Sequence, residues 1–325
     1  MATIKEVAKE AGVSVATVSR VLNGNGYVHE DTRKAVDAAI KKLDYRPNEI
    51  ARSLFNRKSK LIGLVIPDIT NPFFPELARG VEDFLQEQGY RLIIGNSDEN
   101  REKEINYIET FIQHNVIGMI STSGEDTSLW EALKIPVVLL DRVTENYPSV
   151  YADQAGGGRL AAEILLARGS NNITLLRGPQ HVRTAQERFL AALDVLGRSN
   201  AVFQVVNTSF SFKGANETAK QLFDMYPETD GIVASNDIVA SAVLREALKR
   251  GKNIPENLQI VGFDDIPVCE LLYPALSTIH QPAYQMGAEA AKLLIENILH
   301  SSNEAKQIVL PVSFKERETT RKVEM

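Results

Sequence analysis

The sequence predicts a small all-α head followed by a larger α/β core of two doubly wound parallel-sheet lobes. Helical patterns alone fill residues 1–46, whereas from residue 61 onward β-rich apolar runs alternate with amphipathic helical stretches, and this alternation occurs twice. Charge divides at the same place: residues 1–60 contain 12 Lys and Arg against 7 Asp and Glu, which leaves 24 against 35 for the remainder. A basic head on an acidic core indicates that the head meets a polyanion.

The head begins with a helix-turn-helix pattern. Thr3 and Glu6 have the spacing of a capping box at the start of a first helix, and Gly12 permits a tight turn after it. Ser14 can cap a second helix over "VATVSRVLN", and a third helix is expected over residues 30–43. This pattern predicts that the second helix lies in a DNA major groove, although a plain three-helix bundle has the same periodicity.

The outward face of the second helix has side chains suited to reading DNA. Arg20 could contact guanine O6 and N7, and Val15 and Ala16 could touch thymine methyl groups. Hydroxyl and amide groups on the same segment suit phosphate contacts, which fix the register of a protein on the duplex. These phosphate-contacting candidates are Ser14, Thr17, Ser19 and Asn23.

The segment after the head, residues 47–60, predicts a short hinge helix and a linker. Pro47 can open a helix, and residues 48–54 have almost no apolar face to bury. Because so short a helix is marginal alone in water, we expect it to order against a partner. On DNA, an exposed Leu54 could wedge into a minor-groove base step.

The stretch "IKEVAKEAGVSVATVSRVLN", followed by "YRPNEIARSL", resembles the DNA-binding head and hinge of the LacI/GalR family of bacterial repressors. The resemblance implies that Val15, Ala16 and Arg20 read bases and that Leu54 acts at the operator centre. It also implies a homodimer on a pseudo-palindromic, double-stranded DNA operator. No leucine-heptad tail follows the core, which favours a dimer over a tail-mediated tetramer. The residues expected to contact DNA are Ser14, Val15, Ala16, Thr17, Ser19, Arg20, Asn23, Tyr27, Asn48, Ala51, Arg52 and Leu54.

In the core, apolar strands are predicted over "LIGLVIPD", "RLIIGNSD", "VIGMISTS" and "IPVVLLDR", and a second set follows Asp153. Strands separated by amphipathic helices imply parallel sheets that are covered on both faces. This is a periplasmic-binding-protein-like architecture, and the family resemblance continues through it. The expected boundaries are 1–46 for the head, 47–60 for the hinge and linker, and 61–325 for the core. Its N-terminal lobe would take 61–152 and 284–306, and its C-terminal lobe 153–283 and 307–321.

In such sheets ligands bind beyond the carboxyl ends of the strands. Carboxylate, amide and guanidinium groups gather at these ends with phenylalanines nearby, and this combination suits a polyhydroxylated ligand. Taken singly, Asp and Asn at strand ends also serve as helix caps and turn formers. The strand-end candidates are Asp68, Asn71, Asp98, Asp141, Arg142, Asn236, Asp237, Asp264 and Asp265.

The segments at this predicted site resemble the pocket segments of ribose-binding periplasmic proteins and of ribose repressors within the family. They include "ITNPFFPELARGVE", "PVVLLDR", "SFSF", "ASNDIVA", "GFDD" and "STIHQP". The resemblance implies an aldopentose, D-ribose, as the effector, and no cofactor. The residues implied to hold it are Asn71, Phe73, Phe74, Asp141, Arg142, Arg188, Phe210, Asn236, Asp264 and Gln281.

Other classes of function fit the sequence less well. It has neither a G-x-x-x-x-G-K-[ST] loop nor a G-x-S-x-G elbow, and its five histidines lack paired metal-ligand spacing, so no catalytic or metal site is predicted. "MATIKEVAKEAG" does not read as a signal peptide and no long apolar run follows, so we expect a bacterial cytoplasmic, nucleoid-associated protein without membrane contact. Two alternatives stay open: a catabolite-control-type regulator with phosphorylated HPr as corepressor, and a repressor that responds to sucrose or fructose.

Overall fold

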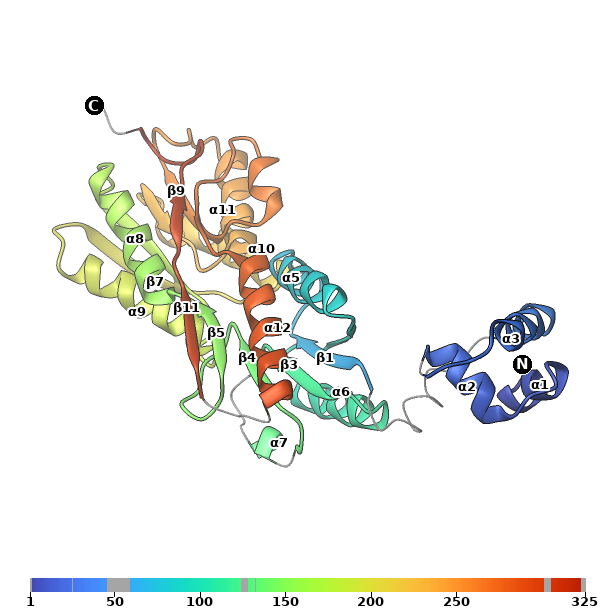
Figure 1. The fold of residues 1–325 in the computed structure, drawn as a ribbon. Coiled ribbons are helices and arrows are strands. Elements are labelled where there is room, and N and C mark those ends of the chain that lie inside the picture. Colours follow the sequence, from blue (N-terminus) through green and yellow to red (C-terminus); the bar gives the residue numbers. More distant parts are fainter. Residues whose placement is uncertain are drawn as a thin grey trace. The chain divides into compact units, whose positions relative to one another are not determined.

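The computed structural model describes residues 2–24, 26–45, 59–123, 128–131, 133–300 and 305–322. The chain divides into two compact units, residues 1–59 and residues 60–325 (Figure 1). The first unit contains the head and the second contains both lobes of the core. The predicted hinge helix falls outside the described residues.

The described part of the head forms three helices around a small apolar core. Thr3 and Glu6 make the predicted capping box, and the Ser14 side chain accepts a hydrogen bond from the backbone N–H of Thr17. Gly12 has a φ of +67°, the left-handed conformation that the tight turn requires. Val7, Val18 and Val36, one from each helix, are fully buried against one another. The helices are α1 (Ile4–Glu10), α2 (Val15–Asn23) and α3 (Glu30–Lys42).

The N-terminal lobe is a parallel sheet with helices on both faces. In β1, Ile62, Leu64 and Ile66 pack toward α5 and α12, while Val65 packs in the cluster that contains α6. This is why the strand is apolar throughout rather than alternating. Its described strands lie in the order β11-β5-β4-β3-β1-β2 across the sheet. Along the chain they are β1 (Leu61–Ile66), β2 (Arg91–Asn96), β3 (Gly118–Ser121), β4 (Val137–Leu140), β5 (Ser149–Ala152) and β11 (Gln307–Leu310). Its helices are α5 (Phe73–Glu87), α6 (Arg101–Gln113), α7 (Ser128–Glu131) and α12 (Ala283–His300).

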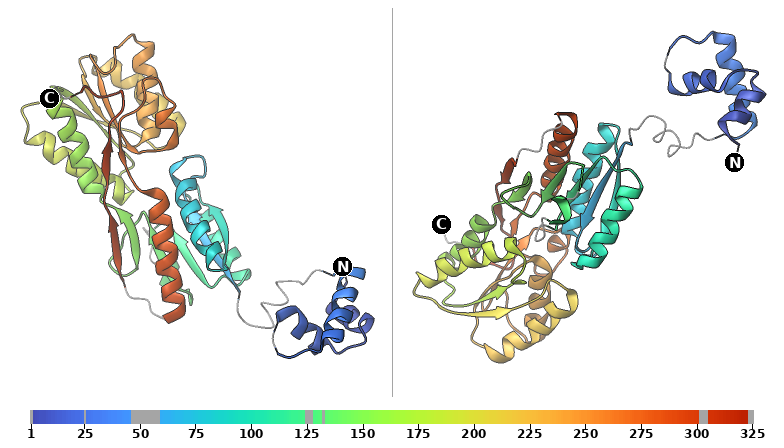
Figure 2. Two further views of the ribbon diagram at one scale, coloured as in Figure 1. Left: turned by 45° about the horizontal axis from the view of Figure 1, so that its top comes forward. Right: turned by 90° about the horizontal axis from the view of Figure 1, so that it is seen from below.

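Helices α5 and α12 lie side by side along the N-terminal lobe (Figures 1 and 2). Glycines allow this contact: a Cβ at Gly80 would lie 1.9 Å from the carbonyl oxygen of Tyr284, and one at Gly287 would lie 2.0 Å from that of Leu77. The segment after the C-terminal lobe is therefore packed firmly back onto the N-terminal lobe.

The C-terminal lobe repeats the arrangement, with α8 and α9 packed together on one face and α10 and α11 on the other. Its edge strand β12 runs antiparallel to β10, and the other pairs are parallel. The described strands lie in the order β12-β10-β9-β8-β6-β7 across the sheet. Along the chain they are β6 (Asn172–Arg177), β7 (Val202–Asn207), β8 (Gly231–Val233), β9 (Gln259–Asp264), β10 (Thr278–His280) and β12 (Ser313–Lys315). The helices are α8 (Gln154–Ala167), α9 (Arg183–Gly197), α10 (Phe212–Met225), α11 (Asp237–Lys249) and the 3₁₀ helix η1 (Pro267–Glu270).

The expected lobe boundaries need one correction. Residues 307–321 were assigned to the C-terminal lobe, but β11 pairs with β5 in the N-terminal sheet, and the chain crosses to the other lobe only between β11 and β12. Pro311 separates the two short strands because proline cannot donate to a sheet ladder. In the described chain the lobes are thus joined by crossovers at residues 152–154, 280–283 and 310–313.

Candidate DNA-reading helix and effector cavity

The base-reading candidates of α2 lie on its outer face. Arg20 and Ala16 are exposed, and Val15 exposes 40% of its surface, while Val18 and Val21 on the inner face are buried. Ala16 and Arg20 are four residues apart and lie on one side of the helix. Exposed apolar side chains and an arginine suit thymine methyl groups and guanine edges in a major groove. The structure therefore leaves the predicted reading face free of the head's own core.

The predicted phosphate-contacting residues are less uniform. The Ser14 hydroxyl is engaged within the helix cap, where it lies 2.9 Å from the Thr17 hydroxyl, and Thr17 and Ser19 are half-buried. Tyr27 is 89% exposed. Asn23 ends α2, and the predicted hinge residues Asn48, Ala51, Arg52 and Leu54 lie outside the described residues.

All ten residues predicted to hold the effector line one cavity of about 670 Å³ between the two lobes of the core. That volume is typical of small-molecule sites, which span roughly 300–1,000 Å³. Strand ends, loops and helices of both lobes supply the lining. From the N-terminal lobe come Asn71, Phe73, Phe74, Asp141 and Arg142, and from the C-terminal lobe and its crossover come Arg188, Phe210, Asn236, Asp264 and Gln281.

Two phenylalanines at the start of α5 form an aromatic wall of the cavity. The rings of Phe73 and Phe74 meet edge to face with their centroids 5.2 Å apart, and both are buried. Asn71 holds this helix start in place, since its Oδ1 accepts a hydrogen bond from the Phe73 N–H at 3.2 Å. The Asn71 amide NH₂ has no partner among the described hydrogen bonds.

An aspartate–arginine pair follows β4. Arg142 donates through Nη1 to Asp141 Oδ2 at 2.7 Å, and the same nitrogen lies 3.4 Å from the Thr184 hydroxyl on α9 of the other lobe. Asp141 has a φ of +55°, a conformation that L side chains rarely adopt. Such backbone strain is found where the surrounding structure fixes a residue for a function.

Arg188 is the buried cation of the C-terminal lobe. Its Nη1 donates to the carbonyl oxygen of Ser235 at 2.6 Å, its guanidinium lies 3.8 Å from the ring centroid of Phe263, and Nη1 lies 3.8 Å from Asp264 Oδ1. Asn236 caps α11 through its Oδ1, which accepts from Val239 N–H at 2.9 Å. Charged, aromatic and amide groups therefore converge on one end of the cavity.

Burial dominates the electrostatics of these groups. It raises the pKa of Asp141, against the effect of Arg142 and Arg188, and raises that of Asp264 well above its usual value, against Arg188. Burial likewise lowers the pKa of Arg188, against the attraction of Asp264 and Asp141. Buried carboxylates and guanidinium groups have lost hydrogen bonds to water, and the hydroxyl groups of a ligand would supply hydrogen bonds in place of water.

A family model described as "Periplasmic binding proteins and sugar binding domain of LacI family" matches residues 59–318, and one described as "Bacterial regulatory proteins, lacI family" matches residues 3–48. The chain belongs to the LacI family. The predicted family and the predicted fold class, a helix-turn-helix head with a periplasmic-binding-protein-like core, are confirmed.

Several members of the LacI family are similar over most of this chain. The ribose operon repressor of Bacillus subtilis (strain 168) is 57% identical over 324 residues, which cover 99% of each chain. A LacI family transcriptional regulator from Enterococcus faecium, solved with bound ribose, is 34% identical with a TM-score of 0.71, and the match covers 81% of this chain and 100% of that one. The Lac repressor dimer bound to operator and the anti-inducer ONPF is 25% identical with a TM-score of 0.88, over 98% of this chain and 99% of that one.

The remaining strand-end candidates have different fates in this LacI family core. Asp68 and Asp98 line the cavity, but Asp98 is exposed and paired with Lys103. Asp265 accepts from Arg317 and lies 2.9 Å from His280, and these contacts outweigh the effect of burial and lower its pKa. Asp237 is fully buried and accepts from the Thr278 hydroxyl and the Ile266 N–H. Asp237 and Asp265 thus stabilise the loop after β9 rather than line the cavity.

Sequence reasoning missed two polar residues at the site. Thr184 lines the cavity beside Arg142, and Gln154 lies behind it, with its side chain bonded to Arg188 and Gln281. Both sit in the first turn of a helix, where polar residues are ordinary. Nothing local marks them, and only the meeting of four chain segments reveals their position.

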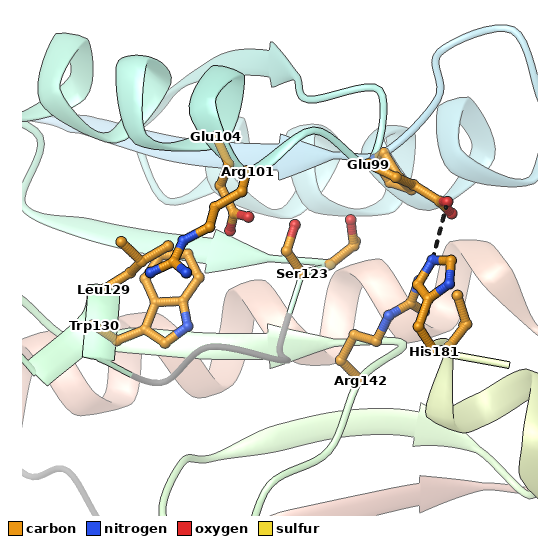
Figure 3. Close-up of a pocket in the computed structure, with 11 residues that line it drawn as sticks. Glu99, Arg101, Glu104, Ser123, Leu129, Trp130, Arg142 and His181 are labelled. Atoms are coloured by element: carbon orange, nitrogen blue, oxygen red, sulfur yellow. Dashed lines mark ion pairs between the residues drawn. The ribbon is translucent and has the colours of Figure 1, made fainter. Parts of the chain in front are cut away.

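A smaller chamber of about 240 Å³ adjoins the cavity and is lined mostly by the N-terminal lobe, with His181 and Val182 from the C-terminal lobe (Figure 3). Leu129 and Trp130 lie at one end of it and Arg142 and His181 at the other. His181 Nε2 lies 3.5 Å from Glu99 Oε2, an ion pair that spans the two lobes at the rim. Because both partners are substantially exposed, this pair adds little stability.

Within the described residues, no group of His, Cys, Asp and Glu side chains could hold a metal ion. In the same part of the chain, no helix is long and apolar enough to cross a membrane.

Proposed function

We propose that this protein is a sequence-specific DNA-binding repressor of a sugar utilisation operon and that free D-ribose, bound between the core lobes, releases it from its operator. The observation that carries the proposal is the convergence of all ten predicted sugar-binding residues on one cavity in a chain that also has an outward-facing reading helix. The similarity to a ribose operon repressor and to a ribose-bound LacI family regulator supports this choice of effector.

The charges of the cavity favour a free sugar over a phosphorylated one. Asp68, Asp141 and Asp264 line it together with Arg142 and Arg188, and each arginine already faces a carboxylate at 2.7 or 3.8 Å. A phosphate would meet these carboxylates at short range, and like charges repel. Sugar hydroxyls donate to carboxylates and accept from guanidinium and amide groups, while the apolar face of a pentose packs on Phe73, Phe74 and Phe210.

We propose that the protein acts on DNA as a homodimer in the bacterial cytoplasm. One α2 reads one half-site, so a pseudo-palindromic operator requires two heads related by a two-fold axis. The Lac repressor, similar to this chain over nearly its whole length, was solved as such a dimer on its operator. The segment 48–54 would order on the minor groove, with Leu54 at the operator centre.

Sugar would act by shifting the core between two arrangements of its lobes. A ligand shifts such an equilibrium only by its difference in affinity for the two forms. A 100- to 1,000-fold loss of operator affinity corresponds to about 2.7–4.1 kcal/mol of coupling. Two cavities in a dimer, each with buried charges that bond to sugar hydroxyls, are sufficient for an effect of that size.

The test is thermal unfolding of the full chain against D-ribose, ribose 5-phosphate, fructose, sucrose and glucose, followed by operator gel shifts with any sugar that stabilises it. Selective stabilisation by ribose, with release from DNA, is the expected result. Stabilisation by fructose or sucrose alone would mean that this sugar, and not ribose, is the effector. If no sugar stabilises the protein, the proposal fails, and phosphorylated HPr becomes the corepressor to mix with it.

A further inference from the structure

The amide of Gln154 occupies a central position behind the effector cavity. Gln154 is the first residue of α8, at the end of the crossover from β5, and is 1% exposed. Its Oε1 accepts hydrogen bonds from Arg188 Nη2 at 2.7 Å and Nε at 3.1 Å. Its Nε2 donates to Gln281 Oε1 at 2.7 Å and lies 3.5 Å from Asp141 Oδ1. It therefore touches three cavity residues without lining the cavity itself.

The same amide joins two of the crossovers between the lobes. Gln154 belongs to the crossover at 152–154 and Gln281 to that at 280–283. Next to them, the backbone N–H of Asp153 donates to the carbonyl oxygen of Leu310 at 2.9 Å, which ties the third crossover to the first. Any change in the angle between the lobes must turn about these three segments. Gln154 thus lies at the point about which the angle between the lobes changes.

The orientation of each amide in this network is determined by its partners. Arginine can only donate, so the Gln154 oxygen must face Arg188 and its NH₂ must face Gln281. The oxygen of Gln281 then accepts, and its own NH₂ donates to Asp264 Oδ1 at 2.7 Å. One assignment satisfies the chain from Arg188 through both glutamines to Asp264. Removal of the Gln154 amide leaves both neighbours with an unpaired buried group.

We propose that Gln154 is a positioning residue that aligns Arg188 and Gln281 for the sugar and couples their positions to the crossovers between the lobes. The inference rests on the proposed sugar-responsive function. Sugar hydroxyls bonded to Arg188, Gln281 or Asp264 fix groups that are bonded in turn to two crossovers. Occupancy of the cavity is then transmitted to the lobe angle through Gln154, with no contact between Gln154 and the sugar.

The first test is Gln154→Leu in the full chain, with D-ribose affinity measured by titration calorimetry. We expect the ribose Kd to rise at least about tenfold, because two buried polar groups lose their partner. At saturating ribose, release from the operator should also be at least about threefold smaller than in the wild type. A wild-type Kd together with wild-type release would overturn the proposal.

A double-mutant cycle separates this role from general loss of stability. If Gln154 and Gln281 act through their shared bond, Gln154→Leu with Gln281→Leu should bind ribose at least about threefold more tightly than the product of the two single losses implies. The matched control is Gln259→Leu, another fully buried glutamine of the core, bonded to Arg168 O, Ser170 Oγ and the Arg321 N–H. It should lower the unfolding temperature without changing the ribose Kd. Strictly multiplicative losses, or an equal rise in Kd for the control, would contradict the inference.

The variant Gln154→Glu tests the role even if the leucine variant does not fold. It keeps oxygen acceptors for Arg188 but has no N–H for Gln281, so its ribose Kd should also rise at pH 7. A protonated carboxyl group regains a donor, so ribose affinity should recover between pH 7 and pH 5 in this variant relative to the wild type at each pH. A constant ratio of the two affinities would refute the inference. If wild type itself binds none of the sugars, the proposed function fails first, a result that no variant can imitate.

Discussion

The proposed base-reading residues of the head are exposed, whereas the proposed effector-binding residues of the core are mostly buried. In the head, Arg20 and Val15 lie on the surface, and a separate set of valines forms the apolar core. In the core, Asp141, Arg188 and Asp264 are each less than 10% exposed and are bonded to one another or to neighbouring residues. The head therefore separates recognition from folding, whereas the core uses the same buried polar groups for both.

This difference predicts how each unit responds to change. An exposed side chain can be replaced with little effect on stability. A buried ion pair is different, because removal of one partner leaves the other charged and without water. We therefore expect substitutions at the effector cavity to act through several residues at once and those on α2 to act singly.

The largest effect on ribose binding is expected at Asp264. Asp264→Asn keeps the shape of the side chain but replaces one of its two oxygens with an NH₂ donor, so that a single oxygen is left to accept from Arg188, Gln281 and the sugar hydroxyls. Ribose affinity should fall about 100-fold, which corresponds to about 2.7 kcal/mol. Titration calorimetry measures the loss, and gel shifts should show a repressor that stays on DNA with ribose present. Asp265→Asn, next in the chain but outside the cavity, is the control and should bind ribose as the wild type does.

A buried acid of the core should make its stability depend on pH, and the head has no counterpart: every acidic residue of residues 2–45 is exposed. Burial raises the pKa of Asp237 from 3.8 to about 6. Between these values the folded chain holds a proton that the unfolded chain has released, so the stability contributed by this group falls as the pH rises from 4 to 6. The full difference is about 3 kcal/mol. Denaturant unfolding measures the free energy of unfolding of the wild type and of Asp237→Asn at each pH. From pH 4 to pH 7 the wild type should lose about that amount of stability relative to the variant. A difference between the two proteins that does not change with pH would contradict the prediction.

On the head, Arg20→Ala should lower the preference for operator over random DNA about 10- to 100-fold, the effect of one bidentate contact with a guanine. Because Arg20 is exposed, the unfolding temperature and the ribose Kd should not change. Competition gel shifts measure the preference. Arg33→Ala, an exposed arginine on α3, should weaken binding to both DNAs alike. If the two variants behave identically, α2 does not read bases.

The smallest effect is expected at the cap of α1. Thr3→Ala removes the hydroxyl that accepts from the Glu6 N–H at 3.4 Å, at a cost of about 1 kcal/mol to the head. Amide hydrogen exchange in α1 should quicken about fivefold, while exchange in the core and ribose binding are unaffected. Thr3→Ser retains the hydroxyl and should exchange as the wild type does. Quickened exchange in the core would mean that the two units do not respond separately.

Local patterns predicted most of the elements of both units. The capping box of α1, the Ser14 cap of α2 and the apolar strands β1–β4 depend on residues that are close in sequence. The short strand β5 was not predicted, and the whole of 307–321 was expected in the C-terminal lobe, whereas β11 pairs with β5 in the N-terminal sheet. Long-range pairing, rather than any local period, decides which sheet a strand as short as β11 or β12 joins.

For the cavity, the sequence determined which polar residue types stand at the strand ends. Resemblance to the LacI family selected ten pocket residues, five of them from that set, and all ten line one cavity. Tertiary structure decided which neighbours reach the ligand: Asp264 lines the cavity, whereas Asp265 turns to His280 and Arg317. It also decided the place of Gln154, which bonds to residues 34 and 127 positions away. Hydrogen bonds between crossovers depend on how the two sheets are ordered and joined, and no local period of the chain encodes that order.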